Sequence, residues 1–536
     1  MKSIYTLRIA LVSLLAVVLF LPGCTDDFEA MNTPDNKLAA SELEATSLAQ
    51  AFSRAQWDGM PSGAGPMHTF QNLNADSYVQ YFSHRLVSDQ YLETSWIGSG
   101  WIYGGAGQML NFVREFTAEN DMPAENAVAN IWRVHIYQRL TDVWGPIPYS
   151  EIGNGKKVVP YDSQEEVYMD FLQRLPDAVE TLKNHRNAQP FGNGDLIYDG
   201  DVDKWIKFAN SLQLRVAMRI SDVEPELARQ KAEEAASRDL IESNESNATL
   251  QTTPSNRNPY HTLSGWTYFR MSSPMESVLE GMGDPRLSEY HNPAWEGDRD
   301  GDGSPYEGMA PGSGPNNPDL LEGAFSDMDT RWLSEEFGGG SNPPWPVMFA
   351  SEVYFLRAEG ALRGWNMGGT AKEFYNEGIR KSMTQERAAD GISSEEIEEY
   401  LNSEGTPKPP EDMWNLPAMS DIPVKYQENA SKERRLEQII TQKWLALYPI
   451  SPEAFSEMRR TGYPRGYPRT ISRNEDGVEA DDVWPRWTYE QTGEYNDNPE
   501  GVTNAAENLL DGPDKNTTLL WWDVERDHLG EPGDNF

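Results

Sequence analysis

Apolar residues recur at helical spacing between residues 124 and 144, and this pattern most constrains how the chain can fold. The spacing predicts an amphipathic helix, which Gly145 and Pro146 then end. The apolar residues on its face are Ala127, Ile131, Val134, Leu140 and Val143. The same periodicity recurs over 41–52, 71–81, 163–182, 203–220, 225–236, 347–363, 370–383 and 435–447. We therefore expect a mostly α fold in which paired helices form the scaffold.

Two long segments, 251–346 and 464–536, lack this periodicity. Both are rich in Gly, Pro, Asn and Asp. Loops of this length are usually either functional or disordered, but their tryptophan content argues against disorder. The tryptophans are Trp266, Trp295, Trp332, Trp345, Trp484, Trp487, Trp521 and Trp522. The sequence therefore predicts long ordered loops laid over the helical scaffold.

The composition supports a folded chain and argues against two classes of binding partner. Of the 536 residues, 38% are hydrophobic and 11% are aromatic, which is enough to build a large core. The formal net charge is −40. A charge of this sign and size argues against binding to nucleic acid phosphates. It also argues against docking on anionic lipid through a basic face.

The N-terminus resembles a secretory signal that ends in a lipid-attachment motif. Lys2 and Arg8 precede the apolar run 9–21, which is too short to span a bilayer as a helix. Residues 21–24 read Leu-Pro-Gly-Cys and resemble a bacterial lipoprotein box, in which a peptidase cuts before the cysteine and the cysteine is acylated. We therefore predict lipidation at Cys24. The alternative is an ordinary signal peptide followed by an unrelated cysteine.

Cys24 is the only cysteine in the chain. Its acylation would leave no thiol, which excludes disulfides, thiolate metal sites and cysteine nucleophiles. The acidic residues that follow it resemble the surface-export tag of Bacteroidetes lipoproteins. We expect a signal peptide over 1–23, an acidic tether over 24–40 and a single ligand-binding domain over 41–536, held on the membrane by lipid.

Five short stretches of the body follow one another in an informative order. They read IYQRLTDVWGPIPYS at 136–150, GDPRL at 283–287, SEVYFLRAEG at 351–360, IITQKWLALY at 439–448 and RRTGYP at 459–464. Together they resemble the SusD/RagB-like family of nutrient-binding outer-membrane lipoproteins. The resemblance covers nearly the whole chain, and its specificity comes from the order of the stretches.

The resemblance implies tetratricopeptide-like helix pairs together with a loop-rich half that binds the ligand. It also implies a place on the outer membrane at the cell surface. The implied partner is a SusC-like TonB-dependent transporter, to which the lipoprotein delivers an oligosaccharide or a peptide. The residues themselves contain no Gly-x-Ser-x-Gly, His-Glu-x-x-His or phosphate-loop motif, so we expect no enzyme. A secreted glycoside hydrolase and a surface adhesion or scaffold protein remain the alternatives.

Aromatic residues in the loops are the candidates for ligand binding. Flat rings stack on the C–H faces of sugars, and an aromatic residue in a loop is less readily explained by helix packing. Trp266, Tyr268, Trp295 and Trp332 are therefore predicted to form a stacking platform. The alternative is that these side chains anchor the long loops to the scaffold.

Residues 298–304 read DRDGDGS and resemble a calcium loop. Alternating acids followed by glycine allow carboxylates to surround one ion, so Asp298, Asp300 and Asp302 are candidate ligands, with Glu307 closing the shell. The twelfth position of the loop is Met309 rather than Glu, which departs from an EF-hand. A solvated acidic turn without a metal is the alternative.

Overall fold

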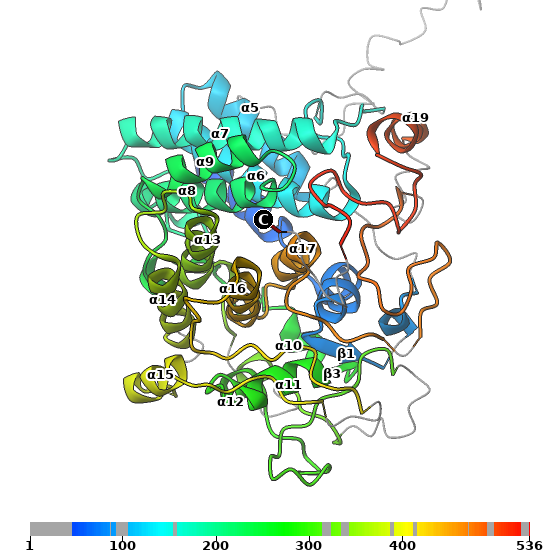
Figure 1. The fold of residues 1–536 in the computed structure, drawn as a ribbon. Helices are drawn as coiled ribbons and strands as arrows, with labels where there is room; N and C mark the ends of the chain where they lie inside the picture. The colour runs from blue at the N-terminus through cyan, green and yellow to red at the C-terminus, as the bar shows by residue number, and fades with distance from the viewer. Residues whose placement is uncertain are drawn as a thin grey trace, which may run out of the picture. The chain divides into compact units, whose positions relative to one another are not determined.

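The helices expected from the sequence pack side by side in a computed structural model of the chain (Figure 1). The structure describes residues 45–85, 87–92, 105–153, 158–313, 323–333, 342–385, 391–410, 415–469, 471–489, 498–526 and 535–536. Contacts divide the chain into two units, Met1–Leu48 and Ala49–Phe536, and every site described below lies in the second. Cys24 and the tether lie outside the described residues. Within those residues, no helix is both long enough and apolar enough to cross a membrane.

The first helical group is a chain of neighbours. After α3 (Ala45–Asp58), it comprises α5 (Gly107–Glu119), α6 (Pro123–Trp144), α7 (Gln164–Asn184), α8 (Val202–Arg219) and α9 (Pro225–Ala236). From α5 onward, each helix packs on the next one in sequence. Sequential helix pairs of this kind bury their apolar faces against their immediate neighbours.

The second helical group lies beside the first. It comprises α13 (Ala350–Arg363), α14 (Ala371–Met383), α15 (Ser394–Leu401), α16 (Lys432–Leu447) and α17 (Ser451–Thr461). Helix α13 packs on α14 and α16, and it also contacts α8 and α9. The two groups therefore share one core, as Figure 1 shows around α8 and α13.

Local signals set the ends of these helices. Ser163 and Glu166 form a capping box at the start of α7, in which each side chain satisfies the backbone N–H of the other. Helix α6 has proline in its first turn and ends at Gly145, whose φ of +84° suits glycine. Both ends agree with the sequence prediction. The predicted helix over 347–363 starts later, because Trp345–Met348 forms a strand and Phe349 is still extended.

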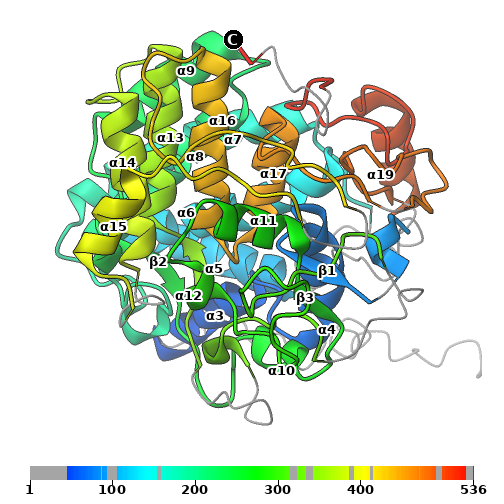
Figure 2. The same cartoon turned by 60° about the horizontal axis from the view of Figure 1, so that its bottom comes forward.

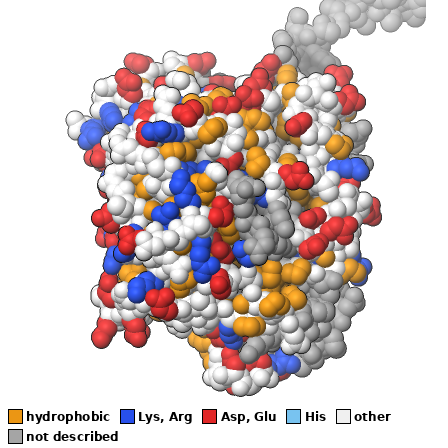
Figure 3. Space-filling view, in the orientation of Figure 1, with side chains coloured by type: hydrophobic (Ala, Val, Ile, Leu, Met, Phe, Trp, Pro, Cys, Tyr) orange, Lys and Arg blue, Asp and Glu red, His pale blue; other side chains and the backbone are white. Residues whose placement is uncertain are grey.

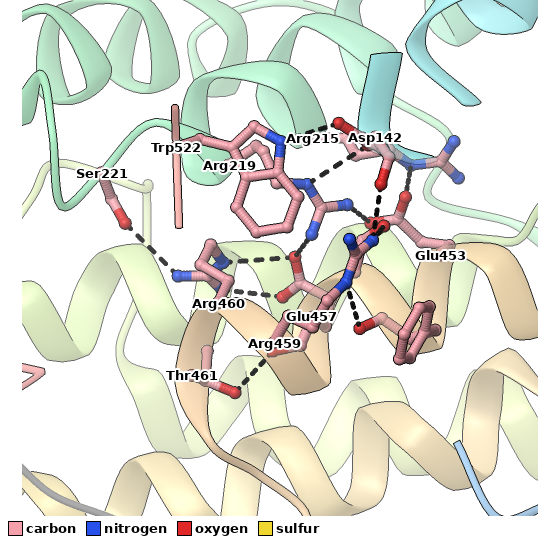
Figure 4. Close-up of polar contacts among 12 residues, drawn as sticks. Asp142, Arg215, Arg219, Ser221, Glu453, Glu457, Arg459, Arg460, Thr461 and Trp522 are labelled. Carbon is pink, nitrogen blue, oxygen red and sulfur yellow. Dashed lines mark hydrogen bonds and ion pairs between the residues drawn. The ribbon is translucent and has the colours of Figure 1, made fainter. Parts of the chain in front are cut away.

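Helix α8 is buried on nearly all sides, including its polar residues. A helix without a solvent face belongs in the centre of a protein, and its charged side chains then need partners. Arg219 at its end contacts Glu453 at 2.6 Å and Glu457 at 2.8 Å, both on α17. Arg460 of α17 contacts Glu359 of α13 at 2.6 Å. Figure 4 shows how the ion pairs of Arg219 with Glu453 and Glu457 join α8 and α17.

Short elements make up the loop-rich half (Figure 2). Strand β1 (Phe82–His84) pairs antiparallel with β3 (Phe269–Met271), with Phe82 opposite Met271. Strand β2 (Ala248–Leu250) pairs antiparallel with β4 (Trp345–Met348). The helices are α4 (Ala64–Met67), the π-helix η2 (His68–Asp76), α10 (Tyr260–Ser264), α11 (Ser273–Gly281), α12 (Leu287–Tyr290), α19 (Pro499–Asn504) and the π-helix η12 (Ala505–Leu509). The 3-10 turns are η3 (Val87–Gln90), η5 (Gly192–Gly194), η6 (Asn244–Ser246) and η8 (Thr330–Trp332).

Several of these elements differ from the sequence prediction. The helix predicted over 71–81 ends at Asp76, and Gln80 adopts a left-handed φ of +59°. Helices α5, α11 and α17 were not predicted. Helix α11 has only 9 residues, so helical periodicity has little length in which to recur.

Candidate ligand-binding site

Two of the predicted platform residues lie together at the surface. Trp266 and Tyr268 expose 37% and 38% of their surface, among the largest exposed apolar side chains that the structure describes. Their ring centroids are 6.3 Å apart, with the rings steeply inclined to each other. Residues 264–268, which we call the Trp266 turn, connect α10 to β3. The turn therefore presents two ring faces within the loop-rich half.

The His68 ring packs against the rings of both Trp266 and Tyr268. Its ring centroid lies 5.2 Å from that of Trp266, edge to face, and 5.9 Å from that of Tyr268. Burial lowers the pKa of His68, so the ring is neutral near pH 7 and packs as an aromatic group. Asn72 lies 3.3 Å from its Nδ1 atom. Sequence reasoning missed His68, because no local pattern connects the start of η2 with a turn almost two hundred residues later.

The backbone between the two rings is strained. Thr267 has a φ of +55°, which is rare for a β-branched residue. The backbone N–H of Arg85 donates to the Tyr268 carbonyl at 2.8 Å, and the Arg85 guanidinium donates to the Thr267 carbonyl at 3.2 Å. Strain of this kind persists only where the surroundings hold it, and it is concentrated at ligand sites.

Trp332 does not belong to this surface, and its inclusion in the platform is corrected. It exposes only 4% of its surface, and its ring packs at 6.0 Å, edge to face, on Tyr260 of α10. The hydroxyl of Tyr260 in turn donates to the Asp76 carboxylate at 2.9 Å. Trp332 therefore anchors its loop to α10, which is the alternative that the sequence left open.

Trp295 is the most exposed large hydrophobic residue that the structure describes, at 66%. It lies on the loop that carries the acidic motif, where the backbone N–H of Ala294 donates to the Pro305 carbonyl and that of Glu296 donates to the Gly323 carbonyl. Its exposure suits a residue that contacts a ligand. Its role, like that of Trp266 and Tyr268, stays a prediction.

Three of the four predicted metal ligands converge. Oxygen atoms of Asp298, Asp300 and Glu307 all lie within 4.8 Å of one another. The Asp298 carboxylate accepts from the backbone N–H groups of Gly301 at 2.7 Å and Gly303 at 3.1 Å, which shapes the loop. Burial and the charge of Asp300 raise the pKa of Glu307. A bound cation would relieve that repulsion, so the donor set fits a hard divalent ion.

Asp302 points elsewhere, which corrects its assignment as a ligand of the same ion. Its carboxylate contacts the Lys408 ammonium at 2.6 Å. Lys408 also pairs with Glu280 and Glu276 of α11. Burial raises the pKa of Glu276 to about 8 despite that lysine. Asp302 therefore links the acidic loop to α11 through Lys408. The spacing of the motif could not reveal this role.

The face of the protein in Figure 3 carries mixed charge. On the face shown in Figure 3, acidic and basic side chains are interspersed with apolar ones. No continuous basic patch is visible on that face.

Comparison with known proteins identifies relatives over nearly the whole chain. The sequence model of the family described as "SusD-like: Susd and RagB outer membrane lipoprotein" matches residues 30–523. A search among curated proteins gave no match.

Solved structures of SusD homologs are also similar to this chain over nearly its whole length. A SusD homolog from Bacteroides uniformis ATCC 8492 is 33% identical, with 89% of this chain and 99% of that chain covered and a TM-score of 0.78. A chitin-binding SusD homolog from Flavobacterium johnsoniae is 30% identical over 90% and 100% of the two chains, with a TM-score of 0.78. A SusD homolog from Bacteroides vulgatus ATCC 8482 is 29% identical over 89% and 98%, with a TM-score of 0.79.

Proposed function

This chain belongs to the SusD/RagB family of outer membrane lipoproteins, and we propose that it captures an oligosaccharide at the Trp266 turn. The observation that carries this proposal is the pair of exposed rings, Trp266 and Tyr268, on a strained backbone. Ligand sites of this kind combine apolar ring faces with a few polar groups that fix orientation. We further propose delivery of the ligand to a SusC-like TonB-dependent transporter.

Membership of the family confirms the expected class of protein. The chain is an outer membrane lipoprotein with the mostly helical SusD-like fold, and its family consists of nutrient-binding proteins rather than enzymes. Lipidation at Cys24 itself stays a prediction, because the family match begins at residue 30.

The chitin-binding relative indicates which ligands to test first. Oligomers of N-acetylglucosamine carry apolar ring faces and amide groups, which suit Trp266 and Tyr268 together with polar neighbours. Binding should also be measured with other oligosaccharides and with short peptides. Binding of peptides alone would show that the ligand is not a glycan.

Replacing Trp266 with alanine should weaken glycan binding by about tenfold. One ring face buried against a sugar contributes on the order of 1–2 kcal/mol. The ring is half-exposed, so the melting temperature and the helical circular dichroism should stay nearly unchanged. Isothermal titration calorimetry against the ligand that binds the unaltered protein measures the effect.

Phe536→Ala provides the matched control for Trp266→Ala. Phe536 is also an exposed aromatic residue, but its ring contacts Arg363 and Lys432 of the helical scaffold. Glycan affinity should not change in this variant. Intact affinity in Trp266→Ala, with loss of stability, would show that Trp266 is a loop anchor instead.

Cleavage of any oligosaccharide by the pure protein would favour the hydrolase alternative, and binding only to whole cells would favour an adhesion protein.

Calcium binding at Asp298, Asp300 and Glu307 is a separate proposal. It rests on the convergence of three carboxylates in a loop where glycines turn the chain. An ion that binds only the folded state stabilises it, by about 2.7 kcal/mol at a hundred times its dissociation constant. Calcium in the millimolar range should therefore raise the melting temperature, and a chelator should reverse the rise.

Asp300→Asn is the sharpest variant for this calcium test. The asparagine oxygen can still accept from the backbone N–H of residue 302, as Asp300 does at 3.0 Å, so the loop keeps its shape while one charge is lost. Asp203→Asn, at an exposed acid outside the loop, is the control and should keep the full response. If neither calcium nor chelator changed the melting temperature, the acidic turn would not bind calcium.

A further inference from the structure

A small cavity lies between α6, α8 and α17, among the charges of the core. Its volume is about 30 Å³, which is room for one or two occupants the size of water. Helix α6 contributes His135, Gln138, Arg139 and Asp142 to its lining. Residues at this spacing share one face of a helix, so a polar stripe of α6 faces the cavity.

Two residues of that stripe are buried without partners. His135 and Gln138 expose 2% and 1% of their surface. Among the described residues, neither ring nitrogen of His135 and neither amide atom of Gln138 has a hydrogen-bond partner. Leaving buried donors and acceptors unpaired is destabilising, because each group has lost its hydrogen bonds to water. In native proteins, buried polar groups that lack a protein partner usually bind a ligand or a water molecule.

Arg139 brings a positive charge to the same cavity. Its guanidinium donates to the sulfur of Met60 at 3.1 Å and lies 5.8 Å from the centroid of the Phe70 ring. A thioether is a weak acceptor, and the described residues place no carboxylate in an ion pair with Arg139. Burial and the charge of Arg215 lower the pKa of Arg139 to about 10. Two carboxylates, Asp142 and Glu453, line the same cavity, but among the described residues neither forms an ion pair with this arginine.

The other charges that line the cavity already have partners. Arg459, which also lines it, donates to the backbone carbonyls of Pro485 and Asp142, both at 2.7 Å. Arg215 contacts the Glu352 carboxylate at 2.6 Å. Asp142 accepts from the Trp522 indole at 2.9 Å and lies 3.6 Å from Arg219, which also holds Glu453. Figure 4 shows Asp142, Arg215 and Glu453 within this network of contacts. Their charges are thus engaged in the cluster, and none of them compensates Arg139.

We propose that this cavity binds a small monovalent anion of the size of chloride, held by the Arg139 guanidinium, the Gln138 amide and an N–H of His135. A water molecule would satisfy the hydrogen bonds but would leave the half-buried Arg139 guanidinium without a counter-charge. The volume of about 30 Å³ suits an ion of this size. The site is independent of the Trp266 turn and of the calcium proposal.

Thermal unfolding at constant ionic strength tests the site. Sodium chloride is compared with sodium gluconate, whose anion is much larger than chloride. Chloride should raise the melting temperature by roughly 1–3 °C and the rise should saturate, as expected for one site on the folded state. Arg139→Met should abolish the rise, because methionine keeps an apolar side chain of similar length without the charge. Arg186→Met, at an exposed arginine, should keep it.

Bromide gives a direct second measurement that does not depend on a variant. Crystals of the unaltered protein grown in bromide should show an anomalous peak between Arg139 and Gln138. Equal melting temperatures in chloride and gluconate, or no bromide peak in the cavity, would show that only water occupies it. A chloride response that persists in Arg139→Met would place the anion elsewhere and would equally overturn the proposal.

Discussion

Arg219→Met should lower the free energy of unfolding by about 3–5 kcal/mol, the usual cost of removing one partner from a buried ion pair. Arg219 is fully buried and contacts Glu453, Glu457 and Asp142 at 2.6, 2.8 and 3.6 Å. Without it, three buried carboxylates lose the cation they share. Urea unfolding followed by tryptophan fluorescence measures the change, because several tryptophans, including Trp522 beside Arg219, are buried.

Arg186→Met is the matched control for this prediction. Arg186 pairs with Asp203 at 3.5 Å, but both side chains are exposed. Exposed ion pairs contribute about 0–1 kcal/mol, since water already solvates both charges. If Arg219→Met were as mild as Arg186→Met, the buried ion pairs would not hold α8 to α17 as we infer.

Cys24→Ala should release the protein from the membrane almost completely. Cys24 follows the lipoprotein box at 21–24 and is the only possible site of thioether lipidation in the chain. A single acyl chain holds a protein only weakly, so stable retention requires several chains on the same residue. Cell fractionation followed by a high-salt wash, with immunodetection in pellet and supernatant, measures the release.

Ser3→Ala is the control for Cys24→Ala. It changes a small residue in the signal but leaves the box intact, and the protein should stay with the membrane. If Cys24→Ala also stayed in the washed membrane pellet, Cys24 would not be the anchor. The wash separates lipid anchoring from charge-driven adsorption, which salt weakens.

Local chemistry made the helices predictable. The capping box at Ser163 and the stop at Gly145 each depend on residues within a few positions of one another. Periodicity identified α6, α7, α8, α9 and α14 to within two residues at each end. It failed for α11, whose 9 residues give the pattern little length in which to recur.

The sequence by itself therefore determined the helical scaffold and, through five ordered stretches, the family. These depend on neighbouring residues or on patterns along the chain. Only the tertiary structure decided that Trp332 is buried on Tyr260, that Asp302 pairs with Lys408 over 106 residues, and that His68 supports Trp266. It alone placed Arg139 beside unpaired His135 and Gln138. Exposure and charge compensation depend on contacts between segments far apart in sequence, and no local pattern records those contacts.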